Sequence, residues 1–150
     1  MADLNELTQR VVNHLANRPV LLRWQNPPSS SAAGQIVKTQ TGELVIYVGN
    51  LEGVNSRLAV FCHEVAHARL DADWIPKSND ARQPSGSINR TQSQRKIWRA
   101  HPRELRAEHQ AAEWLRYANI HKFDYWRVGR SEMECKLLSL LDWREDNGTN

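Results

Sequence analysis

Two histidines placed four positions apart, in the segment His63-Glu64-Val65-Ala66-His67, are the residues best suited to chemistry. On a helix, side chains at positions i and i+4 project from the same side, so these imidazoles could share one metal ion. Glu64 is placed where its carboxylate could take a proton from a water bound to that ion. Because zinc lowers the pKa of its bound water to about 7, the pattern predicts one Zn²⁺ ion and peptide-bond hydrolysis at neutral pH.

The residues around the motif help to distinguish a metal site from a chance match to the His-Glu-x-x-His spacing. Two histidines and a glutamate can match the pattern by chance and lie on a surface or in a core without any metal. Here the residues directly before the motif are apolar. One helical stripe contains Leu58, Phe61 and Cys62 together with Val65 from within the motif. His63 and His67 then lie across the helix from that stripe, so one face can pack while the other binds a metal ion. This setting favours a metal site.

A catalytic zinc site needs a third protein ligand and an open fourth position. One candidate is Asp73, ten positions after His63, where some metallopeptidase sequences place a third ligand beyond a tight turn. That turn calls for glycine, whereas this chain has Leu70 at the position concerned. Asp73 is therefore the second choice.

The alternative ligands are two glutamates farther along the chain, Glu104 and Glu108. They share an expected inward-facing helical stripe with Ala111, Ala112 and Leu115. A buried carboxylate needs a partner, and a metal ion or a metal-binding histidine would be one. The other interpretation is an exposed charged face, on which Glu104 and Glu108 pair with neighbouring arginines.

These two segments together resemble a known family. The HEVAH motif followed by Glu104-x-x-Ala-x-x-x-Ala-Ala-x-x-Leu115 is similar to the ImmA/IrrE group of zinc metallopeptidases and to the metallopeptidase domain of ArdC-type antirestriction proteins. The resemblance covers residues 58–70 and 104–115. It implies a zincin-like fold of the gluzincin type, with Glu104 as the third zinc ligand and Glu108 holding a ligating histidine. It also implies a narrow protein target, such as a regulator from a phage or mobile element.

The elements that would position these residues predict an α+β domain spanning residues 1–150. The opening segment has helical periodicity up to Pro19, with Asp3 and Glu6 placed as a capping box. We expect helices packed on a small antiparallel sheet of about three strands, and a long polar, basic loop over residues 72–100. The expected strands are 20–24, 35–40 and 43–48; the later helices are 56–70, 102–117 and one capped by Ser131 and Glu134.

Composition and charge narrow the classes of function. The 150 residues are 40% hydrophobic and 25% charged, and no apolar run reaches the roughly 20 residues that a membrane helix needs. We therefore expect a cytoplasmic protein. In that compartment Cys62 and Cys135 are expected to be reduced and buried. The net charge is +3, but residues 81–106 hold 7 basic residues against 1 acidic residue. This segment is either a solvated loop or a surface that attracts nucleic acid or an acidic partner.

The predicted activity is that of a small zinc metallopeptidase whose substrate is a protein or peptide. The strand 43–48 is expected to be an edge that pairs with an extended substrate. Candidate donors for the transition state follow the motif helix: His101, His109, Tyr117, His121 and Tyr125. The tryptophans Trp98, Trp114, Trp126 and Trp143 are expected in the core rather than stacked on bases. Two alternatives stay open: a nucleic-acid-binding accessory protein with a structural metal, and an inert zincin that sequesters a partner.

Overall fold

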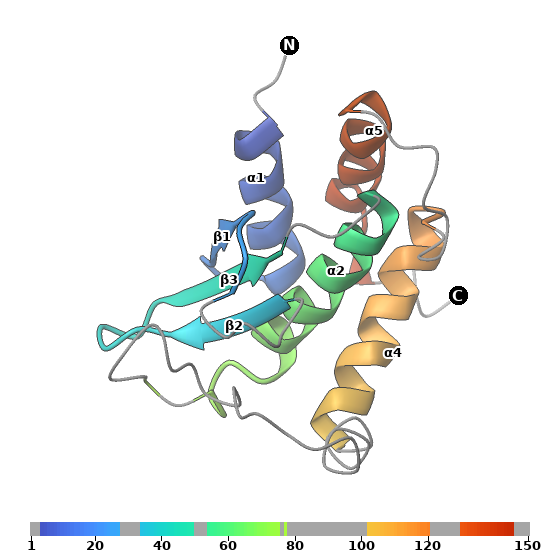
Figure 1. Ribbon diagram of the computed structural model, residues 1–150. Coiled ribbons are helices and arrows are strands. Elements are labelled where there is room, and N and C mark those ends of the chain that lie inside the picture. Colours follow the sequence, from blue (N-terminus) through green and yellow to red (C-terminus); the bar gives the residue numbers. More distant parts are fainter. Residues whose placement is uncertain are drawn as a thin grey trace.

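The computed structural model describes residues 4–27, 34–49, 54–75, 77, 102–120 and 130–145. Within them the chain is α+β, as predicted, with four helices and a three-stranded sheet (Figure 1). The elements are α1 (Leu4–Ala16), β1 (Leu21–Arg23), β2 (Gly34–Lys38), β3 (Leu44–Val48), α2 (Val54–Leu70), α4 (Pro102–Tyr117) and α5 (Arg130–Leu141).

Helix α1 forms because its apolar residues repeat with helical spacing and bury one face. Leu7, Val11, Val12 and Leu15 are all buried. The helix ends at Ala16, and Asn17 adopts a left-handed conformation with φ 57°, which asparagine tolerates better than most residues after a helix. Pro19 follows, as the sequence suggested. Asp3, proposed as a cap, lies outside the described residues.

The sheet is mixed rather than antiparallel, which corrects the prediction. Strands β2 and β3 form the expected antiparallel hairpin around Gly42, whose φ of 89° suits glycine. Strand β1 instead pairs with β3 in parallel, giving the order β1-β3-β2. Ten residues separate β1 from β2, so no tight turn ties the two strands together, and β1 pairs on the far side of β3. Because β3 is the central strand, the prediction that it forms a substrate-binding edge is wrong.

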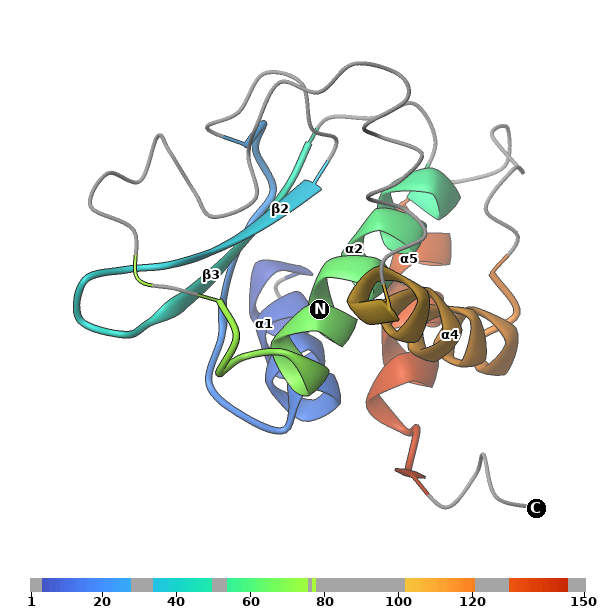
Figure 2. The same cartoon turned by 90° about the horizontal axis from the view of Figure 1, so that it is seen from below.

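Helix α2 lies at the centre of the fold. It contacts α1 and strands β2 and β3, and it packs along α4 (Figures 1 and 2). The predicted apolar stripe is confirmed, because the side chains facing the core are fully buried: Leu58, Phe61, Cys62 and Val65. Helix α5 packs mainly on α1. The two views place these helices on one side of the sheet.

The inward face of α4 differs from the predicted stripe by a rotation of the helix. Ala107, Ala111 and Trp114 are buried, whereas Ala112 and Glu108 are exposed. The small side chains of Ala107 and Ala111 allow α4 to approach α2 closely. Trp114 meets Trp143 edge to face, with ring centroids 5.7 Å apart, so both are core residues as predicted. Trp98 and Trp126 lie outside the described residues.

Cys62 and Cys135 are free; Cys62 is buried, but Cys135 is exposed on α5, contrary to expectation. Ser131 lies within the first turn of α5, not before it, because the helix already begins at Arg130. No helix among the described residues is long and apolar enough to cross a membrane. Most of the predicted loop 72–100 and of the basic segment 81–106 lies outside the described residues.

Gly34, the first residue of β2, permits a close approach between the sheet and α2. A Cβ atom placed on Gly34 would overlap Cγ1 of Val60 and lie 3.2 Å from Cγ of Glu64. A side chain at this position would therefore push β2 away from the helix that carries the motif. Glycine is required here by space.

We expect Gly34→Ala to lower the free energy of unfolding by about 1–3 kcal/mol, the usual cost of overpacking a filled site. Urea denaturation of the metal-free protein measures this change. Val60→Ala removes the atom that the new Cβ would meet. Gly34→Ala should therefore lower the free energy of unfolding much less in the Val60→Ala variant than in the wild type. Simple additivity of the two changes would contradict this account of Gly34.

Candidate metal centre

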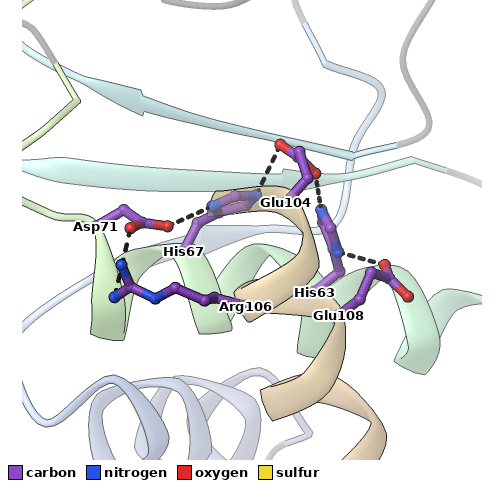
Figure 3. Close-up of polar contacts among 6 residues, drawn as sticks. All are labelled: His63, His67, Asp71, Glu104, Arg106 and Glu108. Atoms are coloured by element: carbon purple, nitrogen blue, oxygen red, sulfur yellow. Dashed lines mark hydrogen bonds and ion pairs between the residues drawn. The ribbon is translucent and has the colours of Figure 1, made fainter. Parts of the chain in front are cut away.

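The structure brings His63, His67 and Glu104 together where α2 and α4 pack (Figure 3). One carboxylate oxygen of Glu104 lies 2.9 Å from Nε2 of His63, and the other lies 3.0 Å from Nε2 of His67. The Glu104 side chain is 12% exposed and the His67 side chain 7%. Of the three candidate third ligands, Glu104 contacts Nε2 of both histidines, whereas Glu108 contacts only His63 and Asp73 is not part of the cluster.

A second carboxylate holds each imidazole from its other nitrogen. Nδ1 of His67 lies 2.9 Å from Oδ2 of the buried Asp71, and because a carboxylate only accepts, Nδ1 donates this hydrogen bond. Nδ1 of His63 lies 2.5 Å from Oε1 of Glu108, an ion-pair contact without the angles of a hydrogen bond. Both rings have their Nε2 atoms facing Glu104. This is how metal-binding histidines are oriented in proteins.

The donor set fits a divalent metal ion such as zinc. Ligand atoms from His63, His67 and Glu104 all lie within 4.8 Å of one another. Bond lengths of about 2.0–2.2 Å in a tetrahedral zinc site place ligand atoms roughly 3.4 Å apart, so the observed spacing needs only small side-chain shifts to surround an ion. Two imidazoles and one carboxylate are also ligands that zinc prefers, whereas calcium and magnesium favour oxygen alone.

Electrostatics couple these groups strongly in the metal-free protein. Burial disfavours the charged form of His63, but the carboxylates of Glu104 and Glu108 outweigh burial and raise its pKa to about 10. Burial likewise opposes ionisation of Glu104, yet the two histidines lower its pKa to about 2. The pKa of His67 is also raised, against the effect of burial, by Glu104 and Glu64. Negative charge at this place thus favours a cation between the imidazoles.

Glu64 lies beside the cluster without being one of its partners. It is 9% exposed, and among the described residues nothing hydrogen-bonds or ion-pairs with its carboxylate. Burial raises the pKa of Glu64, while the nearby histidines act in the opposite direction. A buried carboxylate that none of the described residues engages, beside a candidate metal centre, is suited to holding and moving a proton.

A pocket of about 550 Å³ opens directly beside these groups. His63 and Glu64 line it, and its other described walls come from the start of β2, from α2 and from α4. The pocket therefore reaches the cluster at His63, and such access is needed by a catalytic site but not by a buried structural metal site. Gly34 lines it as well, so the close approach of β2 shapes the site.

Other residues singled out from the sequence lie elsewhere. Asp73 is exposed and lies away from the histidines, because the chain turns immediately after α2. His109 is exposed on α4. Tyr117 lies at the other end of α4 from Glu104, and its hydroxyl donates to Asp142 at 3.2 Å. Three further candidates, His101, His121 and Tyr125, lie outside the described residues.

Sequence reasoning missed Asp71 and the contacts that hold α4 at the site. Asp71 follows His67 by one helical turn, and this i, i+4 spacing was the signal that could have found it. Nη2 of Arg106 lies 3.9 Å from the other oxygen of Asp71. The guanidinium of Arg103 stacks over Trp74 at 4.3 Å from the ring centroid. Both contacts join the first turns of α4 to the turn after α2.

Comparisons of this chain with models of known protein families, with curated proteins and with solved structures found no match.

We expect Glu104→Ala to remove most high-affinity zinc binding, because it leaves the two imidazoles without a third protein ligand. The matched change Asp73→Ala, on an exposed carboxylate, should leave binding as in the wild type. Elemental analysis after dialysis against a weak chelator would give about one zinc per chain for Asp73→Ala and much less for Glu104→Ala. The reverse pattern would exclude Glu104 as a ligand.

Metal binding should also release protons and strengthen as pH rises. His63, with its pKa raised to about 10, carries a proton in the metal-free protein at pH 7, and a metal ion can bind only the unprotonated ring. We expect about one proton or more released per zinc ion, and tighter binding at pH 8 than at pH 6. Calorimetry in buffers of different ionisation enthalpy measures both quantities. Proton release close to zero at pH 7 would contradict the charge state given to His63.

Proposed function

We propose that this protein is a zinc-dependent peptidase in which His63, His67 and Glu104 bind the metal ion. The observation that carries this proposal is the placement of Glu64, a buried carboxylate that none of the described residues engages, beside that cluster and on the wall of a pocket. Three protein ligands support a catalytic rather than a structural role, because structural zinc sites are usually closed by four. The resemblance of the HEVAH motif and the Glu104 segment to ImmA/IrrE metallopeptidases points the same way.

Each side chain then has a distinct task. Zinc bound there would lower the pKa of a water molecule and polarise the substrate carbonyl. Glu64 accepts the proton of the attacking water and later donates it to the leaving amine, a role that its raised pKa supports. Asp71 and Glu108 keep both imidazoles aimed at the ion. Arg106 and Arg103 position Glu104 by joining α4 to the end of α2.

The substrate would lie along the edge of the sheet nearest the metal ligands. Strand β2 pairs with β3 on one side, while its other side has a single bridge among the described residues, between Lys38 and Lys77. Its first residue, Gly34, lies against Glu64. An extended peptide added to this edge would pass the proposed catalytic carboxylate. In this role β2 replaces β3, which the sequence had suggested.

We expect Glu64→Gln to keep one zinc ion per chain while abolishing hydrolysis, because the amide cannot accept the proton of water. The zinc-loaded protein would be incubated with a proteome-derived peptide library, and new termini counted by mass spectrometry. Glu6→Gln, which makes the same change on the exposed face of α1, serves as the control and should match the wild type.

Two outcomes would overturn the proposal. Cleavage by Glu64→Gln at the wild-type rate would remove Glu64 from its role. Absence of cleavage by the wild type, with zinc bound and with partner proteins also tested, would favour an inert metal-binding protein that sequesters its partner.

A further inference from the structure

The pocket beside Glu64 is bordered by α4 over about two helical turns, from Glu108 to Arg116. We refer to it as the α2–α4 groove, and it is lined by Gly34, Ala59, Val60, His63, Glu64, Glu108, Ala111, Ala112, Leu115, Arg116 and Ile120. The α4 residues in this set repeat at intervals of three and four, so they form one continuous strip along the helix. The strip begins at Glu108, beside His63, and ends at Arg116.

The middle of the groove is apolar on both sides. Ala59 and Val60 contribute the α2 wall, and Ala112 and Leu115 contribute the α4 wall. The alanines keep the groove wide, giving it a volume of about 550 Å³, which is large enough for several side chains of a peptide. An aliphatic or aromatic side chain placed here would remove apolar surface from water immediately beside the proposed catalytic carboxylate.

The far end of the groove carries a positive charge. Arg116 is exposed, and no carboxylate among the described residues pairs with its guanidinium. Arg116 lies eight residues after Glu108, which corresponds to about 12 Å along a helix. An extended peptide covers this distance in about three to four residues. A peptide that leaves the metal ligands along the groove would thus reach Arg116 within that number of residues.

We propose that the α2–α4 groove selects the substrate: it binds an apolar residue next to the cleaved bond and, through Arg116, a carboxylate up to four residues farther along the same side of the peptide. This inference rests on the proposed peptidase function, because the occupant is the substrate itself. Continuity of the groove with Glu64 and the charge of Arg116 identify that occupant. The carboxylate belongs either to an aspartate or glutamate side chain or to the C-terminus of the peptide.

The test measures peptide binding separately from cleavage. Labelled peptides are titrated with zinc-loaded Glu64→Gln protein and binding is followed by fluorescence anisotropy. Each peptide has Leu or Ser at one fixed position, and Asp or Asn at one of the four positions that follow it. The same peptides are made as free acids and as C-terminal amides, which distinguishes side-chain from terminal carboxylates. We expect Leu peptides with a carboxylate to bind most tightly, and the preference for the carboxylate to shrink at high salt.

Two variants in the Glu64→Gln background locate the preference in the groove. Arg116→Ala should reduce the ratio of acidic to neutral peptide affinity by about two- to fivefold, the size expected for an exposed ion pair. Arg10→Ala, which removes an exposed arginine of α1 outside the groove, should leave that ratio unchanged. Ala112→Phe should weaken binding of Leu peptides by about tenfold or more by filling the apolar section, whereas Cys135→Phe on the exposed face of α5 should not.

The outcomes separate this inference from the function on which it rests. If the panel binds with the expected preference but the wild type cleaves no peptide, the peptidase function fails and the groove assignment stands. If cleavage occurs but Arg116→Ala and Ala112→Phe change neither affinity nor the residues beside the cleaved bonds, the groove assignment is overturned alone. Failure of every peptide to bind the zinc-loaded protein would overturn it as well.

Discussion

The carboxylate of Glu104 lies between two imidazoles of the neighbouring helix, and this arrangement depends on how closely α4 can approach α2. Ala107 and Ala111 supply that approach because they bury almost no side-chain volume, while Trp114 fills the wider space toward the end of the helix. The same packing exposes the strip of α4 from Glu108 to Arg116 to the groove. The face of α4 that packs on α2 thus positions the metal ligand Glu104, and the adjacent face of α4 borders the groove in which a substrate would lie.

Carboxylates surround the two histidines, and their negative charge has to be balanced. Asp71, Glu104 and Glu108 all contact an imidazole, and Glu64 lies close by without a hydrogen-bond or ion-pair partner among the described residues. In the metal-free protein a proton on His63 supplies part of the balancing charge, because the carboxylates of Glu104 and Glu108 raise its pKa despite burial. A divalent cation would balance this charge better, because one ion can bind several nitrogen and oxygen atoms at once, whereas each proton binds only one.

Features set by residues close together in the sequence could be predicted, and features set by contacts between distant segments could not. The motif helix and the extent of α4 depend on local periodicity, so His63, His67 and the helix from Pro102 to Tyr117 could be expected from spacing. The inward face of α4 was misjudged because adjacent alanines, 111 and 112, fit two overlapping helical stripes equally well. The parallel pairing of β1 with β3 depends on contacts distant in sequence, which no local pattern encodes. Asp71 was overlooked although its spacing from His67 is local.

The ligands come from two helices that are far apart along the chain, and this has a consequence for folding. A metal ion held by His67 and Glu104 would act as a crosslink that closes the loop between residues 67 and 104, restricting the unfolded chain much as a covalent staple does. Part of the free energy of binding would then add to the free energy of unfolding, so the stability of the protein would rise with the concentration of the free ion. The crosslink would add to the packing of α4 along α2 and would resist separation of these two helices.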